Sequence, residues 1–143
     1  MYRRILAALE NGRADAALIP HLRQLASRLG SELLLVHVAD GWVARHYDTL
    51  KLAESDEMRA DRAYLEQVAA ELRQAGLQVD VHLALGDPAR EILKTAAEAH
   101  CDLIAMTTHG HRFIGDLLFG STIAAVRHKA TVPVLLVRAP APD

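Results

Sequence analysis

The residues most able to do chemistry lie near the C-terminus, where a short apolar run is followed by evenly spaced glycines and then a helical pattern. They are the run Leu103 to Met106, the glycines Gly110, Gly115 and Gly120, and Ser121, where the helical pattern begins. A strand that passes through a glycine loop into a helix collects backbone N–H groups at the positive end of the helix dipole. This arrangement attracts phosphate, and it predicts a nucleotide site.

The glycine spacing differs from the better-known nucleotide and hydrolase motifs. The sequence has no Gly-Lys-Ser/Thr of a P-loop, no G-x-G-x-x-G dinucleotide signature and no Gly-x-Ser-x-Gly elbow. It also shows no paired carboxylates and no nucleophile with an obvious base, so it predicts no rapid catalysis and leaves slow ATP hydrolysis open. The alternative that the glycines only shape a surface loop also stays open.

Other polar candidates have simpler structural interpretations. His109 and His111 lack a third ligand at a metal-binding spacing, so we expect loop hydrogen bonds and no metal site. His37 lies in an apolar strand and is predicted to be a core histidine bonded to backbone or carboxylate. Cys101 precedes a buried strand and is expected to pack, and Asp87 is expected to cap a helix.

Length and composition limit the architecture. A chain of 143 residues with 51% hydrophobic and only 4% aromatic residues predicts one α/β domain, spanning 1–143, with an aliphatic core. The 16 basic and 18 acidic residues give a net charge of −2, which disfavours a nucleic-acid partner. The sequence shows no signal peptide and no apolar run long enough to span a bilayer, so we expect no membrane insertion and a cytoplasmic location.

The elements that must position the glycine loop alternate along the chain. Apolar runs predict five strands, at Arg4 to Leu9, Glu32 to Val38, Val79 to Leu83, Leu103 to Met106 and Val134 to Val137. Helical periods predict four helices, at Arg13 to Leu29, around Met58 to Leu72, from Pro88 onward and from Ser121 onward. Pro20 should kink the first helix or mark its true start, and the polar stretch to about Leu52 is expected to be a loop or helix entry. This alternation predicts a parallel sheet with helices on both faces and a binding crevice where the strand order reverses.

Several segments together carry a family resemblance. They are RILAAL, LLLVHV, Gly86-Asp87-Pro88, Thr108-His109-Gly110, Gly120-Ser121 and PVLLV. The chain resembles the universal stress protein family, whose nucleotide-binding members carry Gly-x2-Gly-x9-Gly-Ser/Thr after the fourth strand. The second and third glycines of that motif match Gly110 and Gly120. The resemblance implies a Rossmann-like sheet of order 3-2-1-4-5 and a homodimer formed through Val134 to Val137.

The resemblance also implies which residues bind a ligand. The adenosine pocket would comprise Ala8, Leu9, Glu10, Val38, Met106 and Thr107, and the phosphate cradle would comprise Gly110, His111, Arg112, Gly120, Ser121 and Thr122. The implied ligand is ATP, ADP or AMP, with or without Mg²⁺, and the implied role is a stress-response switch or sensor.

Two positions depart from the family pattern. Glu10 stands where the family has Asp, and Thr107 stands at the first glycine of the motif. The longer Glu10 side chain could hold the ribose differently, and the β-branched Thr107 could crowd the ligand. These departures favour the alternative function, a dimeric interaction module that binds a partner protein without a nucleotide.

Overall fold

A computed structural model describes residues 1–39, 56–108 and 117–140, and of residues 117–120 it describes the backbone alone. The strands are β1 (Arg4–Ala8), β2 (Glu32–Ala39), β3 (Val79–Leu85), β4 (Leu103–Thr108) and β5 (Val134–Arg138). The helices are α1 (Asp15–Leu29), α3 (Asp56–Gln74), α4 (Pro88–Glu98) and α5 (Leu117–Lys129). The predicted alternation of strands and helices is confirmed.

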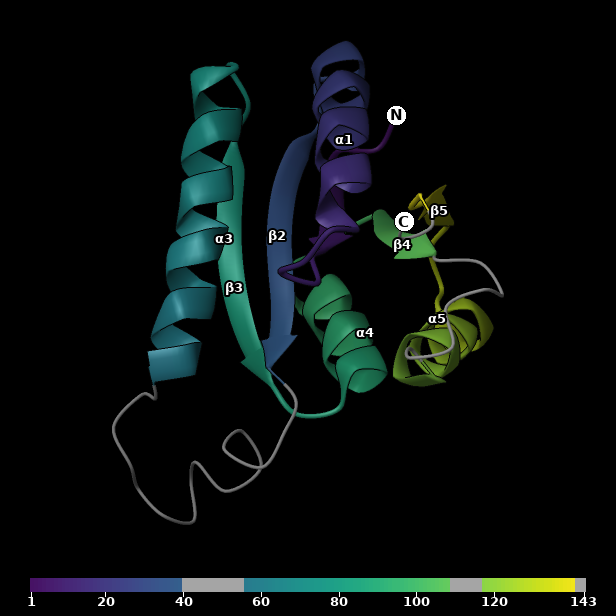
Figure 1. Ribbon diagram of the computed structural model, residues 1–143. Helices are drawn as coiled ribbons and strands as arrows, with labels where there is room; N and C mark the ends of the chain where they lie inside the picture. Colours follow the sequence, from purple (N-terminus) through teal and green to yellow (C-terminus); the bar gives the residue numbers. More distant parts are fainter. Residues whose placement is uncertain (40–55, 109–116, 141–143) are drawn as a thin grey trace.

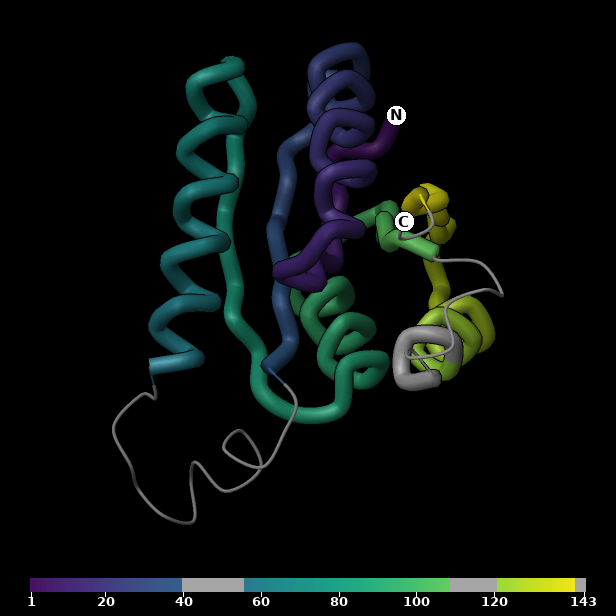
Figure 2. Tube along the Cα trace, viewed as in Figure 1, coloured from purple at the N-terminus to yellow at the C-terminus, as the bar shows by residue number. Residues whose placement is uncertain are grey.

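All five strands are parallel and follow the order β3-β2-β1-β4-β5, as predicted. The chain builds outward from β1 to β3, crosses the sheet through α4 and then adds β4 on the other side of β1 (Figure 2). The strand order therefore reverses between β1 and β4. In parallel α/β sheets this is the place where the carboxyl ends of the strands leave room for a ligand.

Two apolar layers cover the sheet. Helices α1 and α3 lie on one face and α4 and α5 on the other (Figure 1). Alternate residues of each strand face opposite sides, so Ile5 and Ala7 join the α1–α3 layer while Leu6 and Ala8 join the α4–α5 layer. Burial on both faces explains why the strands read as continuous apolar runs.

Local signals explain the end of α1 and the start of α4. Gly30 ends α1 in the left-handed region at φ 69°, where a residue without a Cβ meets no steric penalty. Asp87 caps α4 by accepting the Arg90 N–H at 2.9 Å, and Pro88 occupies the first turn, both as predicted. Pro20 lies inside α1, five residues after its start at Asp15, so the prediction that it could mark the start of the helix is wrong.

The start of α5 also differs from the prediction. The helix begins at Leu117, four residues before Ser121, so Gly120 and Ser121 lie within its first two turns. Leu117, Leu118 and Phe119 are acceptable helix formers, and one glycine costs only about 1 kcal/mol in a helix. Gly120 therefore lies inside a helix that was expected to begin directly after it. The polar stretch before α3 lies within residues 40–55, outside the described residues.

Candidate functional site

The candidate site begins where β1 and β4 end. Ala7 pairs with Ala105 in the parallel ladder, so the next residues, Ala8 and Met106, emerge side by side at the carboxyl edge. On the other side of β1, the Leu9 N–H donates to the Val36 carbonyl at 2.8 Å. The sheet thus brings the ends of β2, β1 and β4 together.

The structure places the predicted adenosine residues along this edge. Ala8, Leu9, Met106 and Thr107 are buried, while Glu10 is partly exposed. Val38 lies near the end of β2 and is also partly exposed. The strands therefore gather these residues at one end of the sheet, and their contact with a ligand stays a prediction.

The predicted phosphate residues are only partly described. Gly110, His111 and Arg112 lie outside the described residues. Gly120, Ser121 and Thr122 belong to α5, where Ser121 is exposed and Thr122 is buried.

A buried carboxylate fixes the loop after β1. Asp15, at the start of α1, is only 1% exposed. It accepts hydrogen bonds from the backbone N–H groups of Glu10 and Asn11, both at 2.9 Å, and from the Tyr64 hydroxyl at 2.6 Å. These bonds hold Asn11 at a positive φ of 60°, a conformation that asparagine tolerates better than most residues.

A second carboxylate approaches the same loop from α3. Asp61 accepts a hydrogen bond from the Asn11 side-chain amide at 2.6 Å, and its other oxygen lies 3.6 Å from His37 Nε2. The opposite ring nitrogen of His37, Nδ1, lies 2.9 Å from the Leu9 carbonyl oxygen. His37 therefore contacts both a backbone carbonyl and a carboxylate, which confirms its interpretation as a satisfied core histidine.

Sequence reasoning missed Asn11, Asp15, Asp61 and Tyr64, although one signal was present. The buried face of α3 comprises Met58, Asp61, Leu65, Val68, Ala69 and Leu72. An aspartate at an apolar position of a helical repeat needs a buried partner, because an unpaired buried charge is costly. That position could have marked Asp61 as part of a polar network.

Two environments change the acidity of side chains. Burial, the hydrogen bond to Asp15 and the charge of that carboxylate together raise the pKa of Tyr64 well above its ordinary value of 10.0. Burial also raises the pKa of the Cys101 thiol, outweighing the opposite effect of Arg4. Cys101 packs in the α4–α5 layer as predicted, and a thiol in this state is a poor nucleophile.

Thr107 has an unusual environment for a threonine. It is 3% exposed, and its hydroxyl has no hydrogen-bond partner in the described part of the chain. Strand alternation places it on the α1–α3 face with Leu103 and Ala105. The hypothesis that Thr107 crowds a ligand stays a prediction.

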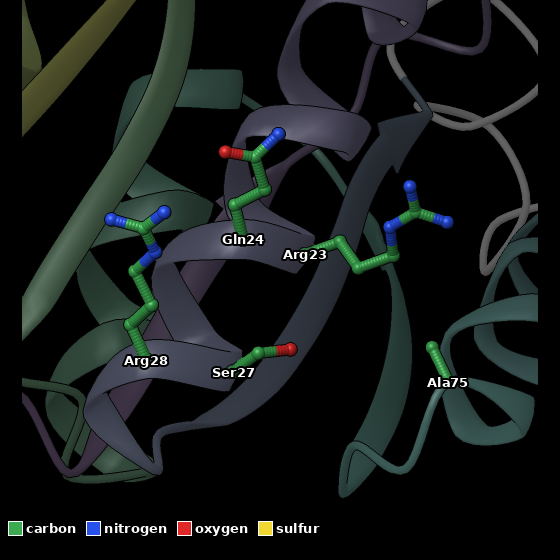
Figure 3. A pocket seen from close by; sticks show the side chains of 5 residues that line it. All are labelled: Arg23, Gln24, Ser27, Arg28 and Ala75. Atoms are coloured by element: carbon green, nitrogen blue, oxygen red, sulfur yellow. The ribbon is translucent and has the colours of Figure 1, made fainter.

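A separate open pocket of about 340 Å³ lies between α1 and the end of α3, lined by Arg23, Gln24, Ser27, Arg28 and Ala75. Its residues come from the C-terminal half of α1 and from Ala75, which directly follows α3, so the pocket lies away from the carboxyl edge of the sheet. Figure 3 shows the two arginine side chains extending in different directions from α1. They do not converge on one anion, and the pocket is not part of the candidate site.

The described residues also bear on metal binding and membrane spanning. Within residues 1–39, 56–108 and 117–140, no group of three or more His, Cys, Asp or Glu side chains could hold a metal ion. None of the helices in those ranges has the length and apolar character needed to cross a bilayer.

Comparisons with known proteins agree with this geometry. A curated relative, universal stress protein MJ0577 of Methanocaldococcus jannaschii, is 25% identical, with 96% of each chain covered. The solved structure of MJ0577 matches with a TM-score of 0.76 over 96% of each chain.

Two more distant structures share the fold. A universal stress protein of Archaeoglobus fulgidus, solved in complex with dAMP, has a TM-score of 0.69 at 20% identity and covers 95% of this chain and 98% of its own. Another universal stress protein, solved in complex with cAMP, has a TM-score of 0.70 at 18% identity, with 95% and 96% covered. The model of the universal stress protein family matches residues 1–138. The chain therefore belongs to the universal stress protein family.

Proposed function

We propose that this protein binds an adenine nucleotide at the carboxyl ends of β1 and β4 and acts as a switch or sensor in a stress response. The observation that carries the proposal is the reversal of strand order at β1 and β4, with the loop after β1 held rigid by Asp15. Two proteins of the same fold, solved with dAMP and with cAMP, support an adenine nucleotide as the ligand.

The roles of individual residues form part of the proposal. The adenosine would be held by Ala8, Leu9, Glu10, Val38, Met106 and Thr107, and the phosphates by Gly110, His111, Arg112, Gly120, Ser121 and Thr122. The first turns of α5 would supply backbone N–H groups to the phosphates. ATP with Mg²⁺ is the proposed ligand form, with ADP and AMP as alternatives, and the proposed location is the cytoplasm.

Thermal unfolding with and without nucleotide tests the proposal. A ligand that binds only the folded state stabilises it by mass action, by about 2.7 kcal/mol at one hundred times the dissociation constant. We therefore expect millimolar ATP with Mg²⁺ to raise the melting temperature, and GTP to raise it less. Identification of any nucleotide released from the purified protein would distinguish ATP, ADP and AMP.

A variant of α5 tests where the nucleotide binds. Gly120→Val should abolish binding, because the added side chain would occupy the approach of the phosphates. Valine has a better helix propensity than glycine, so α5 should persist. Ala124→Val, one turn further along α5 at an exposed position, is the matched control and should bind normally.

Two outcomes would contradict the proposal. If the unaltered protein shows neither binding heat nor a thermal shift with ATP, ADP or AMP, nucleotide binding is wrong and the nucleotide-free interaction module is favoured. If Gly120→Val binds as well as Ala124→Val, the phosphates do not lie at α5.

A further inference from the structure

His37 joins the ends of β1 and β2 to α3. Its Nδ1 lies 2.9 Å from the Leu9 carbonyl oxygen, and its Nε2 lies 3.6 Å from Asp61 Oδ2. The side chains of His37 and Asp61 are only 15% and 11% exposed. The other oxygen of Asp61 accepts the Asn11 amide at 2.6 Å, so this chain of contacts returns to the loop after β1.

Each ring nitrogen of His37 faces an oxygen atom, the Leu9 carbonyl on one side and the Asp61 carboxylate on the other. When Asp61 is ionised, both of these groups can only accept hydrogen bonds. A carbonyl oxygen is always an acceptor, so the contact with Leu9 requires a proton on Nδ1. The imidazolium also carries a proton on Nε2 and attracts the Asp61 carboxylate. The neutral ring carries one N–H proton. If that proton is on Nε2, the hydrogen bond to the Leu9 carbonyl is lost; if it is on Nδ1, the lone pair of Nε2 faces the Asp61 carboxylate.

These contacts involve or border residues that are proposed to bind the nucleotide. Leu9 and Glu10 follow β1, and Val38 follows His37 in β2. Resting on the proposed function, we propose that His37 and Asp61 are positioning residues that hold this edge in the binding conformation while His37 is an imidazolium. They act through Leu9 and Asn11 and do not contact the nucleotide.

Three elements contribute the contacts that position His37. Strand β1 contributes the Leu9 carbonyl, α3 contributes Asp61, and the residue opposite His37 on β3 is the apolar Leu83. Asp15 and Tyr64, the other ionisable side chains that hold the loop after β1, bond to each other. The raised pKa of Tyr64 keeps its hydroxyl protonated near neutral pH, so the Asp15 contacts do not change where histidine titrates.

The test measures the affinity for ATP with Mg²⁺ by calorimetry from about pH 5.5 to about pH 8.5, the range in which histidine changes charge. We expect the affinity of the unaltered protein to fall about tenfold as pH rises, a typical size for coupling between two sites. The phosphates of ATP also titrate near pH 6, but this contribution is common to every variant and cancels when variants are compared.

Asp61→Asn removes the charge of the Asp61 side chain but keeps its shape and hydrogen-bonding groups. Its amide can still accept the Asn11 hydrogen bond and can donate to the unprotonated Nε2 of a neutral His37. This variant should bind ATP with an affinity that changes less than twofold between the ends of the range, once the phosphate contribution is removed. His82→Asn, at an exposed position of β3, is the matched control and should keep the pH profile of the unaltered protein.

His37→Asn gives a second variant. Its amide can reach the Leu9 carbonyl but carries no titrating proton, so we expect weaker binding with a flat profile. Proton uptake on ATP binding, measured in buffers of different ionisation enthalpy, should be larger in the unaltered protein than in either variant, in which only the phosphate contribution remains. A purely structural role would lower affinity equally at every pH and leave proton uptake unchanged.

Three outcomes would overturn the inference. Parallel pH profiles for the unaltered protein and folded Asp61→Asn would show that His37 does not control the site, while nucleotide binding itself would stand. Unchanged proton uptake in His37→Asn would show the same independently of Asp61. If the unaltered protein binds no ATP even at the acidic end, the proposed function fails and this inference fails with it.

Discussion

Asp15 stabilises the loop after β1 because its carboxylate accepts three hydrogen bonds. Its carboxylate accepts two backbone N–H groups and the Tyr64 hydroxyl, and it is almost completely buried. Hydrogen bonds to charged groups are stronger than neutral ones, and a buried carboxylate without them would be strongly destabilising. Thr107 is the contrasting case, since its buried hydroxyl has no partner in the described residues.

The hydroxyl of Tyr64 gives a prediction about pH. Tyr64→Phe should lower the free energy of unfolding by about 1.5 to 3 kcal/mol near neutral pH, because it removes a hydrogen bond to a carboxylate. Burial and Asp15 raise the folded-state pKa of Tyr64 above the unfolded value of 10.0. Its contribution is therefore complete below pH 10.0 and is lost as pH rises above it.

Urea unfolding at neutral and at alkaline pH checks this prediction. The difference in unfolding free energy between the unaltered protein and Tyr64→Phe should shrink at the alkaline pH. A difference that stays constant would mean that the folded state does not favour the protonated hydroxyl.

At the scale of single elements, the sequence predicted strands and helices wherever one physical signal dominated. β1 and β5 were recognisable as apolar runs, and the start of α4 was recognisable from Asp87 and Pro88. The start of α5 was not, because Gly120 opposes helix formation by an amount that its neighbours can offset. Pro20 was misleading for a similar reason, since the rest of α1 packs against the sheet and compensates for the missing hydrogen bond.

The cap of α4 gives a prediction at this scale. Asp87→Ala should lower the free energy of unfolding by about 1 kcal/mol, because the Arg90 N–H loses its partner. Asp87→Asn is the matched control and should stay close to the unaltered protein, since asparagine also caps helices well. Denaturant unfolding would measure both, and equal losses in the two variants would show that the cap bond is not the cause.

At the scale of the whole molecule, strand order and layers followed from the alternation of elements, whereas the polar network did not. Asp15, Asp61 and Tyr64 come from two helices that are distant in the sequence, and only Asp61 carries a sequence signal, its place on the apolar face of α3. Only packing α1 and α3 on the same face brings them to the loop after β1. The site was therefore predictable as a position on the sheet, but its supporting contacts were not.

Strand β5 lies at one edge of the sheet, and the residues Val134 to Val137 are only partly buried. We propose that two copies pair along this edge as a homodimer, which would satisfy its unpaired backbone groups. Ile104 donates to the Pro133 carbonyl and Ala139 donates to the Thr108 carbonyl. In a parallel ladder this alternation turns the N–H groups of Val134, Leu136 and Arg138 away from β4, toward a partner.

Leu136→Pro should therefore disrupt the dimer without breaking the β4–β5 ladder, because it removes an N–H that points outward. The same change at Leu135 would remove a donor to β4 and weaken the monomer itself. Leu136→Ala is the matched control, since it shortens the side chain and keeps the N–H. Light scattering should find a dimer for the unaltered protein and Leu136→Ala, and a folded monomer for Leu136→Pro. A monomeric unaltered protein, or a dimeric Leu136→Pro, would show that copies of this chain do not pair through β5.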